Sequence, residues 1–516
     1  MLTNIPTTTL SGRSVLRTDL DANPSSGELK KDLERVLPQH NYNLGQIREL
    51  QEYLKGWHPA IQDRVKTTRT DVDNKITVDY AYSITRDIVG YFLGKPVQYT
   101  QREGKFRTQM QKFNDALKAE SKALVDYQIA EHCSVCGVGY RGIFSEASAR
   151  NGTHLKLLCL NPLTTFVVYS TDPLKPPVYA VTSYESAATE SPSVVGTPSE
   201  VVTYYKVYTT NKQITFKTTT GPGQVEGIPA ADLELVDEKD ILFGGGLPIV
   251  EYENNQWRLG DWEVAVALMD ALDAVTSDGV NDIQQAVNSV LVAMGMELTK
   301  DQFDNLSVNG FLNVKDIPPG VKPVVEFINQ AMEADVGVSM RDYLEATLRV
   351  IVGVPDRKTR GGGGGGDTGD AVFMRDGWQD IDLVATAKEQ YFIQAERDAL
   401  SVMLYILDVH NETKKLAAQD IDIHFNRNKT ANLQSKAQVY QTLTSGDAPI
   451  APVDALDIAG LTNNVPDVIL RAESYAAERA KKRIEEKKAA QALKNDESDS
   501  GKKGDPSKAG DEDGTD

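Results

Sequence analysis

Apolar residues near the start of the chain recur at spacings of three and four, which is the pattern of an amphipathic helix. The spacing predicts a short amphipathic piece around 29–37 and helices over 44–58, 78–94 and 105–136. Gly94 and Pro96 follow the second of these helices closely, and Gly137 follows the third. Glycine and proline just beyond the last apolar turn are strong stop signals. The first quarter of the chain is therefore expected to be helical.

The pattern changes between Tyr140 and Phe243 to short runs rich in Thr, Val and Tyr. Gly, Pro, Asn and Ser separate these runs, as expected for strands joined by turns. The predicted strands are Leu155–Leu160, Thr165–Tyr169, Val201–Tyr208 and Gln213–Lys217. A polar stretch over 183–199 is interpreted as a surface loop. This part of the chain is expected to be a β-rich insertion.

Helical spacing returns after Trp257. It predicts one helix through Val264 and Val275 and a second piece from Val280 to Val287, because Ser277-Asp-Gly279 interrupts the pattern. Further elements are expected as a small α/β piece over 288–330, helices over 332–352 and 378–410, a strand over 421–425, and a helical region over 432–488. The predicted class is therefore α+β and mainly helical.

Composition indicates a globular protein of several domains. The 516 residues correspond to three or four domains of ordinary size, and 40% of them are apolar. The chain has no continuous apolar run of the roughly 18 residues that a membrane-spanning helix needs, so we expect no membrane partner. The segment from Met1 to Gly12 has neither a basic residue nor an apolar core, so it does not resemble a secretory signal.

Charge and cysteine content narrow the chemistry. The net charge of −19 argues against a protein that wraps DNA, because that affinity comes from Lys and Arg on phosphates. Cys133 and Cys136 form a CxxC with His132 and His154 nearby. A second CxxC is missing, so we favour two small buried residues at a helix end over zinc or redox chemistry. We expect no metal and no cofactor.

Motifs of catalysis are missing as well. The chain has no phosphate-binding G-x-x-x-x-G-K-[ST], and Asp367 rather than lysine follows the glycine run. HExxH and GxSxG do not occur, and the six histidines have no carboxylate or cysteine partner at a recognisable catalytic spacing. The sequence therefore predicts a protein that is not an enzyme.

Four segments in a fixed order carry a family resemblance. They are Thr85–Pro96, with Gly-Tyr-Phe-Leu-Gly-Lys-Pro at its end; Leu247–Asn255 with Leu259-Gly-Asp261, Leu272-Asp273 and Ser277-Asp278; Val354-Pro-Asp356 with Thr368-Gly-Asp-Ala371; and Ile423–Asn428. Together they resemble the portal proteins of tailed double-stranded DNA bacteriophages, of the long-tailed type. The resemblance extends over about residues 45–485. Two features depart from the family pattern: Thr368 replaces the usual serine, and the hexaglycine is unusual.

The resemblance implies a ring, expected to be a dodecamer, whose subunits have wing, stem, clip and crown regions. The implied regions are an N-terminal, partly disordered arm 1–44, wing 45–245, stem entry and first stem helix 246–287, clip 288–330, second stem helix 331–354, tunnel loop 355–372, long wing helix and strand 373–430, helical crown 431–490, and a disordered acidic tail 491–516. The implied place is the capsid portal vertex of the virion, after assembly in the host bacterial cytoplasm.

The implied function is a channel for packaging and ejecting double-stranded DNA. The implied partners are the ring's other subunits, DNA in transit, the terminase large subunit, major capsid and scaffolding proteins, and a head-tail adaptor. Two alternatives stay open at this point. One is a DNA-processing enzyme such as a nuclease or recombinase, and the other is a different structural capsid or adaptor protein.

Two groups of charged residues are candidates for contact with the channel. Residues 251–282 hold eight acids and a single base, Arg258. In a ring, a repeated acidic face repels phosphates and lets DNA slide; a solvated helix face is the alternative interpretation. The wall candidates are Asp261, Glu263, Asp270, Asp273, Asp278 and Asp282.

The second group is the basic cluster before the glycines. It is interpreted either as a counter-charge to a helix C-terminus or as a flexible loop that touches DNA transiently. The tunnel-loop candidates are Arg357, Lys358, Arg360, Gly361, Gly362, Gly363, Gly364, Gly365 and Gly366.

Overall fold

The structure is a computed structural model. It describes residues 12–66, 72–101, 106–150, 152–187, 201–220, 233–241, 243–287, 290–294, 324–328, 334–355, 378–413, 416–427, 433–445, 450–459, 461 and 465–500. The chain divides into two compact units. The first comprises residues 1–97, 108–419 and 425–430, and the second comprises 98–107, 420–424 and 431–516.

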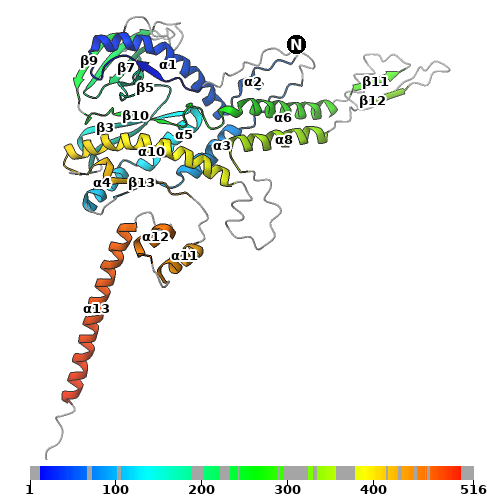
Figure 1. Ribbon diagram of the computed structural model, residues 1–516. Coiled ribbons are helices and arrows are strands. Elements are labelled where there is room, and N and C mark those ends of the chain that lie inside the picture. The colour runs from blue at the N-terminus through cyan, green and yellow to red at the C-terminus, as the bar shows by residue number, and fades with distance from the viewer. Residues whose placement is uncertain are drawn as a thin grey trace, which may run out of the picture. The chain divides into compact units, whose positions relative to one another are not determined.

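The first unit contains both the sheets and the longest paired helices (Figure 1). Its helices are α1 (Ser26–Leu54), α2 (Pro59–Gln62), α3 (Tyr80–Leu93), α4 (Arg107–Ala119, of which Arg107 falls in the second unit), α5 (Lys122–Cys136), η1 (Glu263–Ala265), α6 (Val266–Val287), α8 (Ala334–Val352), α10 (Trp378–Val409) and η3 (Ala418–Asp420, whose Asp420 falls in the second unit). Its strands are β1 (Leu16–Thr18), β3 (Val138–Arg150), β4 (Thr153–Leu160), β5 (Thr165–Ser170), β6 (Tyr179–Ala187), β7 (Val201–Tyr208), β8 (Lys212–Thr220), β9 (Glu234–Asp240), β10 (Ile249–Glu253), β11 (Val290–Met294) and β12 (Val324–Ile328).

Two sheets and two helical layers are stacked in the body of this unit (Figure 1). A six-stranded sheet has the order β1-β5-β6-β7-β8-β9, and a three-stranded sheet has the order β10-β3-β4. Helix α1 covers one face of the larger sheet, where Leu29 and Leu33 join a core with Phe166 and Val181. The other face packs on the smaller sheet through Val167 and Ile249, among others. Helices α5 and α10 cover the far side of the smaller sheet.

The second unit is small. It holds the antiparallel pair β2 (Gln98–Gln101) and β13 (Ile421–His424), and the helices α11 (Leu433–Ser445), α12 (Pro452–Ala459) and α13 (Val465–Ser500). In α13 the side chains over 471–488 are all exposed. No described helix in either unit combines the length and apolar character that crossing a membrane requires.

The α+β class is confirmed, and several elements differ from the predicted ones. Helix α1 begins at Ser26, where the Ser25 and Glu28 side chains form a capping box, and runs through Pro38 to Leu54. The predicted helix over 105–136 is two helices, because Ser121 adopts a left-handed conformation between them. The tail predicted to be disordered begins at residue 491, but residues 491–500 belong to helix α13, which ends at Ser500. The long helix over 378–410 is confirmed as α10.

Candidate functional site: the α6–α8 pair and its attachment

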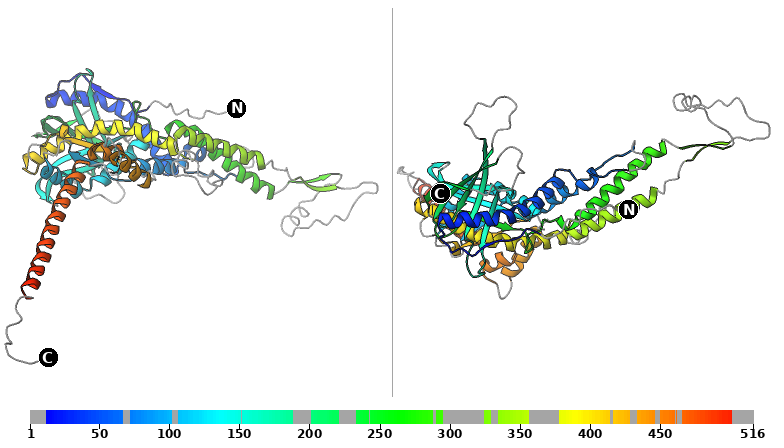
Figure 2. Two further views of the ribbon diagram at one scale, coloured as in Figure 1. Left: turned by 60° about the horizontal axis from the view of Figure 1, so that its bottom comes forward. Right: turned by 90° about the horizontal axis from the view of Figure 1, so that it is seen from above.

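Helices α6 and α8 lie side by side and are joined in sequence through the two-stranded β11–β12 sheet (Figures 1 and 2). Leu272 on α6 and Leu348 on α8 are buried. The predicted break at Ser277-Asp-Gly279 is wrong, because α6 runs without interruption from Val266 to Val287. One glycine costs a helix only about 1 kcal/mol relative to alanine, which packing readily outweighs.

A row of polar side chains on α6 holds an extended segment of the chain. Asp273 Oδ1 accepts from Val78 N at 2.8 Å, Ser277 Oγ from Ile76 N at 3.0 Å, and Asn281 Oδ1 from Asn74 N at 2.8 Å. The three α6 residues are buried. Four helical residues rise about 6.0 Å. Two extended residues rise about 6.6 Å. Every fourth residue of α6 therefore lies beside every second residue of the extended segment, over three contacts.

Asp273 also binds a histidine from the start of the chain. Its Oδ2 bonds His58 Nδ1, and the other ring nitrogen faces Tyr53 O at 3.3 Å. Burial alone lowers the pKa of His58, but the hydrogen bond and charge of Asp273 outweigh it, so the pKa is raised above 6.5. Tyr53 donates from its hydroxyl to Asp270 at 2.8 Å. The base of α6 is thus tied to the end of α1.

The loop before α6 fits against the rest of the unit through its backbone. Gly137 has φ +77°, and a Cβ there would lie 1.9 Å from the carbonyl oxygen of Arg258. Asn254 donates from Nδ2 to Leu259 O and to Asp261 Oδ1, both at 2.8 Å. Lys388 on α10 pairs with Asp261 at 2.7 Å. This loop therefore positions the start of α6 against α5 and α10.

The six wall candidates separate into three groups by burial. The side chains of Asp261, Glu263 and Asp273 are at most 6% exposed, and each has a cationic or imidazole partner within the chain; that of Glu263 is Arg13. Asp270 is half-buried beside Tyr53. Asp278, 55% exposed and paired with Arg64, and Asp282 lie on the surface. Only these last two offer a carboxylate to solvent, and a channel-facing role for the six stays a prediction.

The partners of the buried acids could not be found from spacing. Arg13 and Glu263 are 250 residues apart, and His58 and Asp273 are 215 apart. In the sequence, the buried acids Glu263 and Asp273 lie close together, whereas the residues that balance their charges lie more than 200 positions away. The tunnel-loop candidates Arg357, Lys358, Arg360 and Gly361–Gly366 lie outside the described residues.

One face of α8 is apolar and uncovered. Met340, Tyr343, Val350 and Ile351 are 49%, 65%, 79% and 51% exposed. Their spacing places them on one side of the helix within about a third of its circumference. Soluble proteins rarely leave such a stripe in contact with water unless it is an interaction surface.

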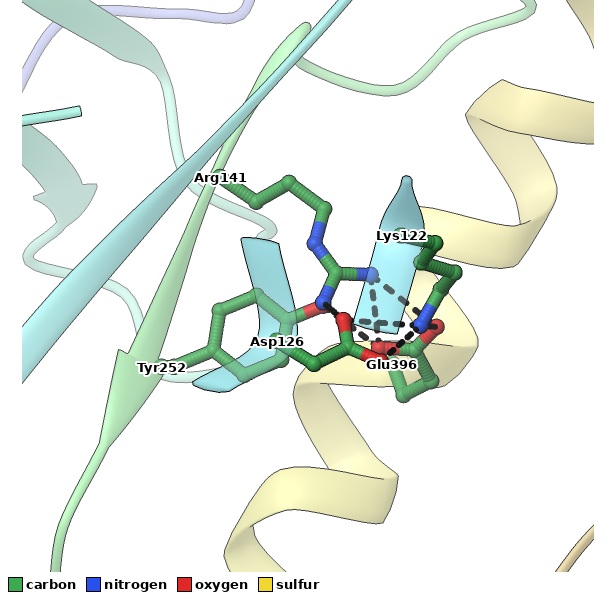
Figure 3. A network of polar contacts seen from close by, with 5 residues as sticks. All are labelled: Lys122, Asp126, Arg141, Tyr252 and Glu396. Atoms are coloured by element: carbon green, nitrogen blue, oxygen red, sulfur yellow. Dashed lines mark hydrogen bonds and ion pairs between the residues drawn. The ribbon is translucent and has the colours of Figure 1, made fainter. Parts of the chain in front are cut away.

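The body that carries this pair contains a buried charge network (Figure 3). Arg141 on β3 pairs with Glu396 on α10 at 2.8 Å and with Asp126 on α5, and Lys122 bridges Asp126 at 2.7 Å and Glu396 at 3.1 Å. Tyr252 donates to Glu396 at 2.7 Å. Burial alone would raise the pKa of Glu396, but Arg141 and Lys122 lower it to about 2. The network fixes α5 and α10 to the smaller sheet.

The CxxC cysteines are buried at the end of α5, as predicted. Cys133 donates to Tyr252 O at 3.3 Å, and the Gln51 amide contacts Cys136 Sγ at 3.8 Å. Burial raises the pKa of both thiols. Among the described residues no cluster of His, Cys, Asp or Glu is arranged to hold a metal ion.

A sequence model described as "Phage portal protein, SPP1 Gp6-like" matches residues 33–489. The chain belongs to this phage portal protein family. No curated protein matches significantly. Similar solved structures are weak matches. They include "Neck of empty GTA particle computed with C6 symmetry" (10% identity, TM-score 0.40, covering 74% of this chain and 89% of that chain) and "Virion of native gene transfer agent (GTA) particle" (9%, 0.42, 80% and 93%).

The segments that carry the portal resemblance have structural roles in this portal chain. The Asn254–Asp261 stretch forms the loop against Gly137, and Asp273 and Ser277 hold the extended segment along α6. In the last segment, Phe425 stacks on Phe92 with ring centroids 5.4 Å apart, and Arg427 pairs with Asp382 and Glu389 on α10. These motifs position helices of the portal subunit.

Proposed function

We propose that this portal protein assembles into a ring, expected to be a dodecamer, at the portal vertex of a phage capsid. The ring encloses the channel for packaging and ejecting double-stranded DNA. It docks the terminase large subunit during packaging and a head-tail adaptor afterwards, and it contacts major capsid and scaffolding proteins. The role is structural and not enzymatic, and assembly takes place in the host bacterial cytoplasm.

The family match carries this proposal, and the apolar face of α8 supports it. Met340, Tyr343, Val350 and Ile351 remain exposed in the single chain. A helix face of this kind gains free energy when a neighbouring subunit covers it, at roughly 25 cal/mol per Å² of apolar surface. Closed point-group symmetry is the usual way in which copies of one chain cover such faces.

Electron microscopy of the purified full-length chain tests ring formation. We expect closed rings from the wild type and loss of rings from Val350→Asp, because that change places a charge in the subunit contact. Leu174→Asp is the matched control, since Leu174 is 92% exposed on the same unit and belongs to the connection between β5 and β6, not to α6 or α8. A wild-type chain that sediments only as a monomer at all concentrations would contradict the proposal.

The tunnel loop is the part that we propose touches DNA. Arg357, Lys358 and Arg360 supply few charges per subunit, so each phosphate contact is weak and DNA can move. The exposed Asp278 and Asp282 would repel phosphates elsewhere in the channel. Replacing the three bases with serine should leave rings intact and lower DNA packaging or retention. Rings that package and retain DNA at the wild-type level would refute this role.

A further inference from the structure

The smaller sheet has an unpaired edge. In the β10–β3 pair, Ile143 N bonds Pro248 O at 2.7 Å and Asn254 N bonds Gly137 O at 3.0 Å. Antiparallel pairing alternates, so Val250 and Tyr252 also face β3. The backbone N–H and C=O groups of the residues between them, Ile249, Glu251 and Glu253, point away from β3. No hydrogen bond to these backbone groups is present in the described part of the chain.

This edge opens into a groove of about 580 Å³ that described residues line. On one side lies β5, with Val167 and Tyr169, and on the other lies one face of α10. The α10 residues of the groove follow helical spacing; they are Tyr391, Gln394, Ala395, Asp398, Ser401 and Val402. At one end Gly244–Gly246 has no side chains to close the groove.

The groove has the chemistry of a slot for an extended chain. An accessible row of unpaired N–H and C=O groups is a template for pairing with another chain, and a strand added beside β10 would satisfy these groups. Its alternate side chains would meet two different walls. One set would face the apolar Val167 and the ring of Tyr169. The other would face Gln394, Asp398 and Ser401.

The charge of the groove selects a basic occupant. Its charged lining residues are Glu251, Glu253, Asp398 and Lys175. Lys175 already pairs with Asp21 at 3.1 Å, and a single guanidinium, that of Arg258, serves both glutamates. Burial raises the pKa of Glu253 and of Asp398, as expected for carboxylates short of counter-charge. The chain's net charge of −19 makes a different, basic protein the better complement.

We propose that this groove binds an extended segment of another protein, with Lys or Arg at alternate positions, which adds to the smaller sheet as a strand beside β10. Strand addition takes its affinity from main-chain hydrogen bonds and its specificity from the alternate side chains. The inference does not depend on ring formation, because every group involved belongs to one chain.

A fluorescent peptide of alternating lysine and valine, roughly seven residues long to match a typical strand, is the probe. Anisotropy with the full-length chain should show saturable binding. Methylating the peptide nitrogens that face β10 should weaken binding by about tenfold or more, since each lost bond contributes about 1 kcal/mol. Methylation in the other register should leave binding unchanged. Equal effects in both registers would overturn strand addition, and equal binding of a glutamate–valine peptide would overturn the charge selectivity.

Variants of the chain locate the site. Asp398→Asn should weaken binding, and Asp240→Asn, an exposed acid on β9 outside the groove, should not. Ser401→Trp should block the groove, whereas Ser445→Trp on α11 should bind the probe like the wild type. Thermal unfolding checks that each variant folds. If Ser401→Trp also abolishes rings, the occupant is a second copy and the proposal of a different protein fails. It fails equally if deleting residues 1–11 raises the probe's affinity, because the groove then holds the chain's own terminus.

Discussion

The charges at the base of α6 and those along α13 are arranged in opposite ways. At the base of α6, Glu263 and Asp273 are buried and are balanced by residues more than 200 positions away in the chain. Along α13, the charged side chains over 471–488 are exposed, and Glu478 pairs with Lys482 one turn later. The first arrangement depends on the whole fold, and the second depends only on the helix.

The difference shows what a run of charge in a sequence means. The acids of 251–282 suggest a negative surface, yet their partners Arg13, His58 and Lys388 reach them from three other segments. Local charge density in a sequence is therefore not charge density at a surface. In α13, by contrast, the charged side chains over 471–488 are exposed, and the partner of Glu478 lies four residues away. These balancing charges can therefore be identified from the sequence.

The largest effect is expected from removing a buried acid. Asp273→Ala leaves His58 and the amide of Val78 without their partner in a buried site. Breaking a buried pair on one side typically costs about 3–5 kcal/mol. Asp282→Ala, on the exposed part of the same helix, is the control and should stay within about 0.5 kcal/mol of the wild type. Urea unfolding of both variants measures the difference, and similar losses would contradict the comparison.

Two buried histidines sharpen the comparison through pH. His58, beside Asp273, has a pKa raised above 6.5, so its folded form holds its proton more tightly than the unfolded chain does. Its contribution to stability is present below about pH 6.5 and is lost as the pH rises through the folded pKa. His40 packs on Phe166 without an acid, and burial lowers its pKa to about 3. As the pH falls below about 6.5, His40 is protonated in the unfolded chain before it is protonated in the folded one, so the free energy of unfolding decreases as the pH decreases.

Single substitutions separate the two histidines. The stability advantage of the wild type over His58→Gln should shrink as the pH rises from about 6 to 9. The free energy of unfolding of the wild type should decrease relative to that of His40→Gln as the pH falls from about 7 to 4. Urea midpoints across this range check both trends. A His58→Gln difference that grows with pH would show that Asp273 does not stabilise the protonated ring.

Long periodic elements could be predicted from the sequence, and special local conformations could not. Helix α10 matches its predicted range because its apolar spacing persists over many turns. The start of α1 was missed because His40 and Asn43 are polar yet buried, the latter bonded to Ser14. Ser277 was predicted to interrupt the helix because serine is common in turns. Its hydrogen bond with the distant backbone of Ile76 cannot be identified from the sequence.

The candidate site was predictable to a smaller extent. Order and spacing of the portal motifs pointed to the family, which the match over 33–489 confirms. The same motifs gave no hint that Asp273 and Ser277 hold residues 76–78, because that contact joins positions about 200 apart. Nor could the free edge of β10 be foreseen, since an edge depends on which strands pair and not on the residues of the strand itself.

The smallest effect is expected on α13, and its size tests whether this helix has a partner. Lys482→Ala removes the exposed pair with Glu478, whose atoms lie 3.4 Å apart. Pairs of this kind stabilise a helix by about 0.3–0.5 kcal/mol and are screened by salt. Circular dichroism of the full chain should therefore show a slight loss of helix at low salt and none at roughly 1 M salt. A loss several times larger, or one that persists in high salt and appears only in assembled rings, would mean that α13 packs against a neighbouring subunit. Its charges would then be balanced across subunits, as those of α6 are balanced across the chain.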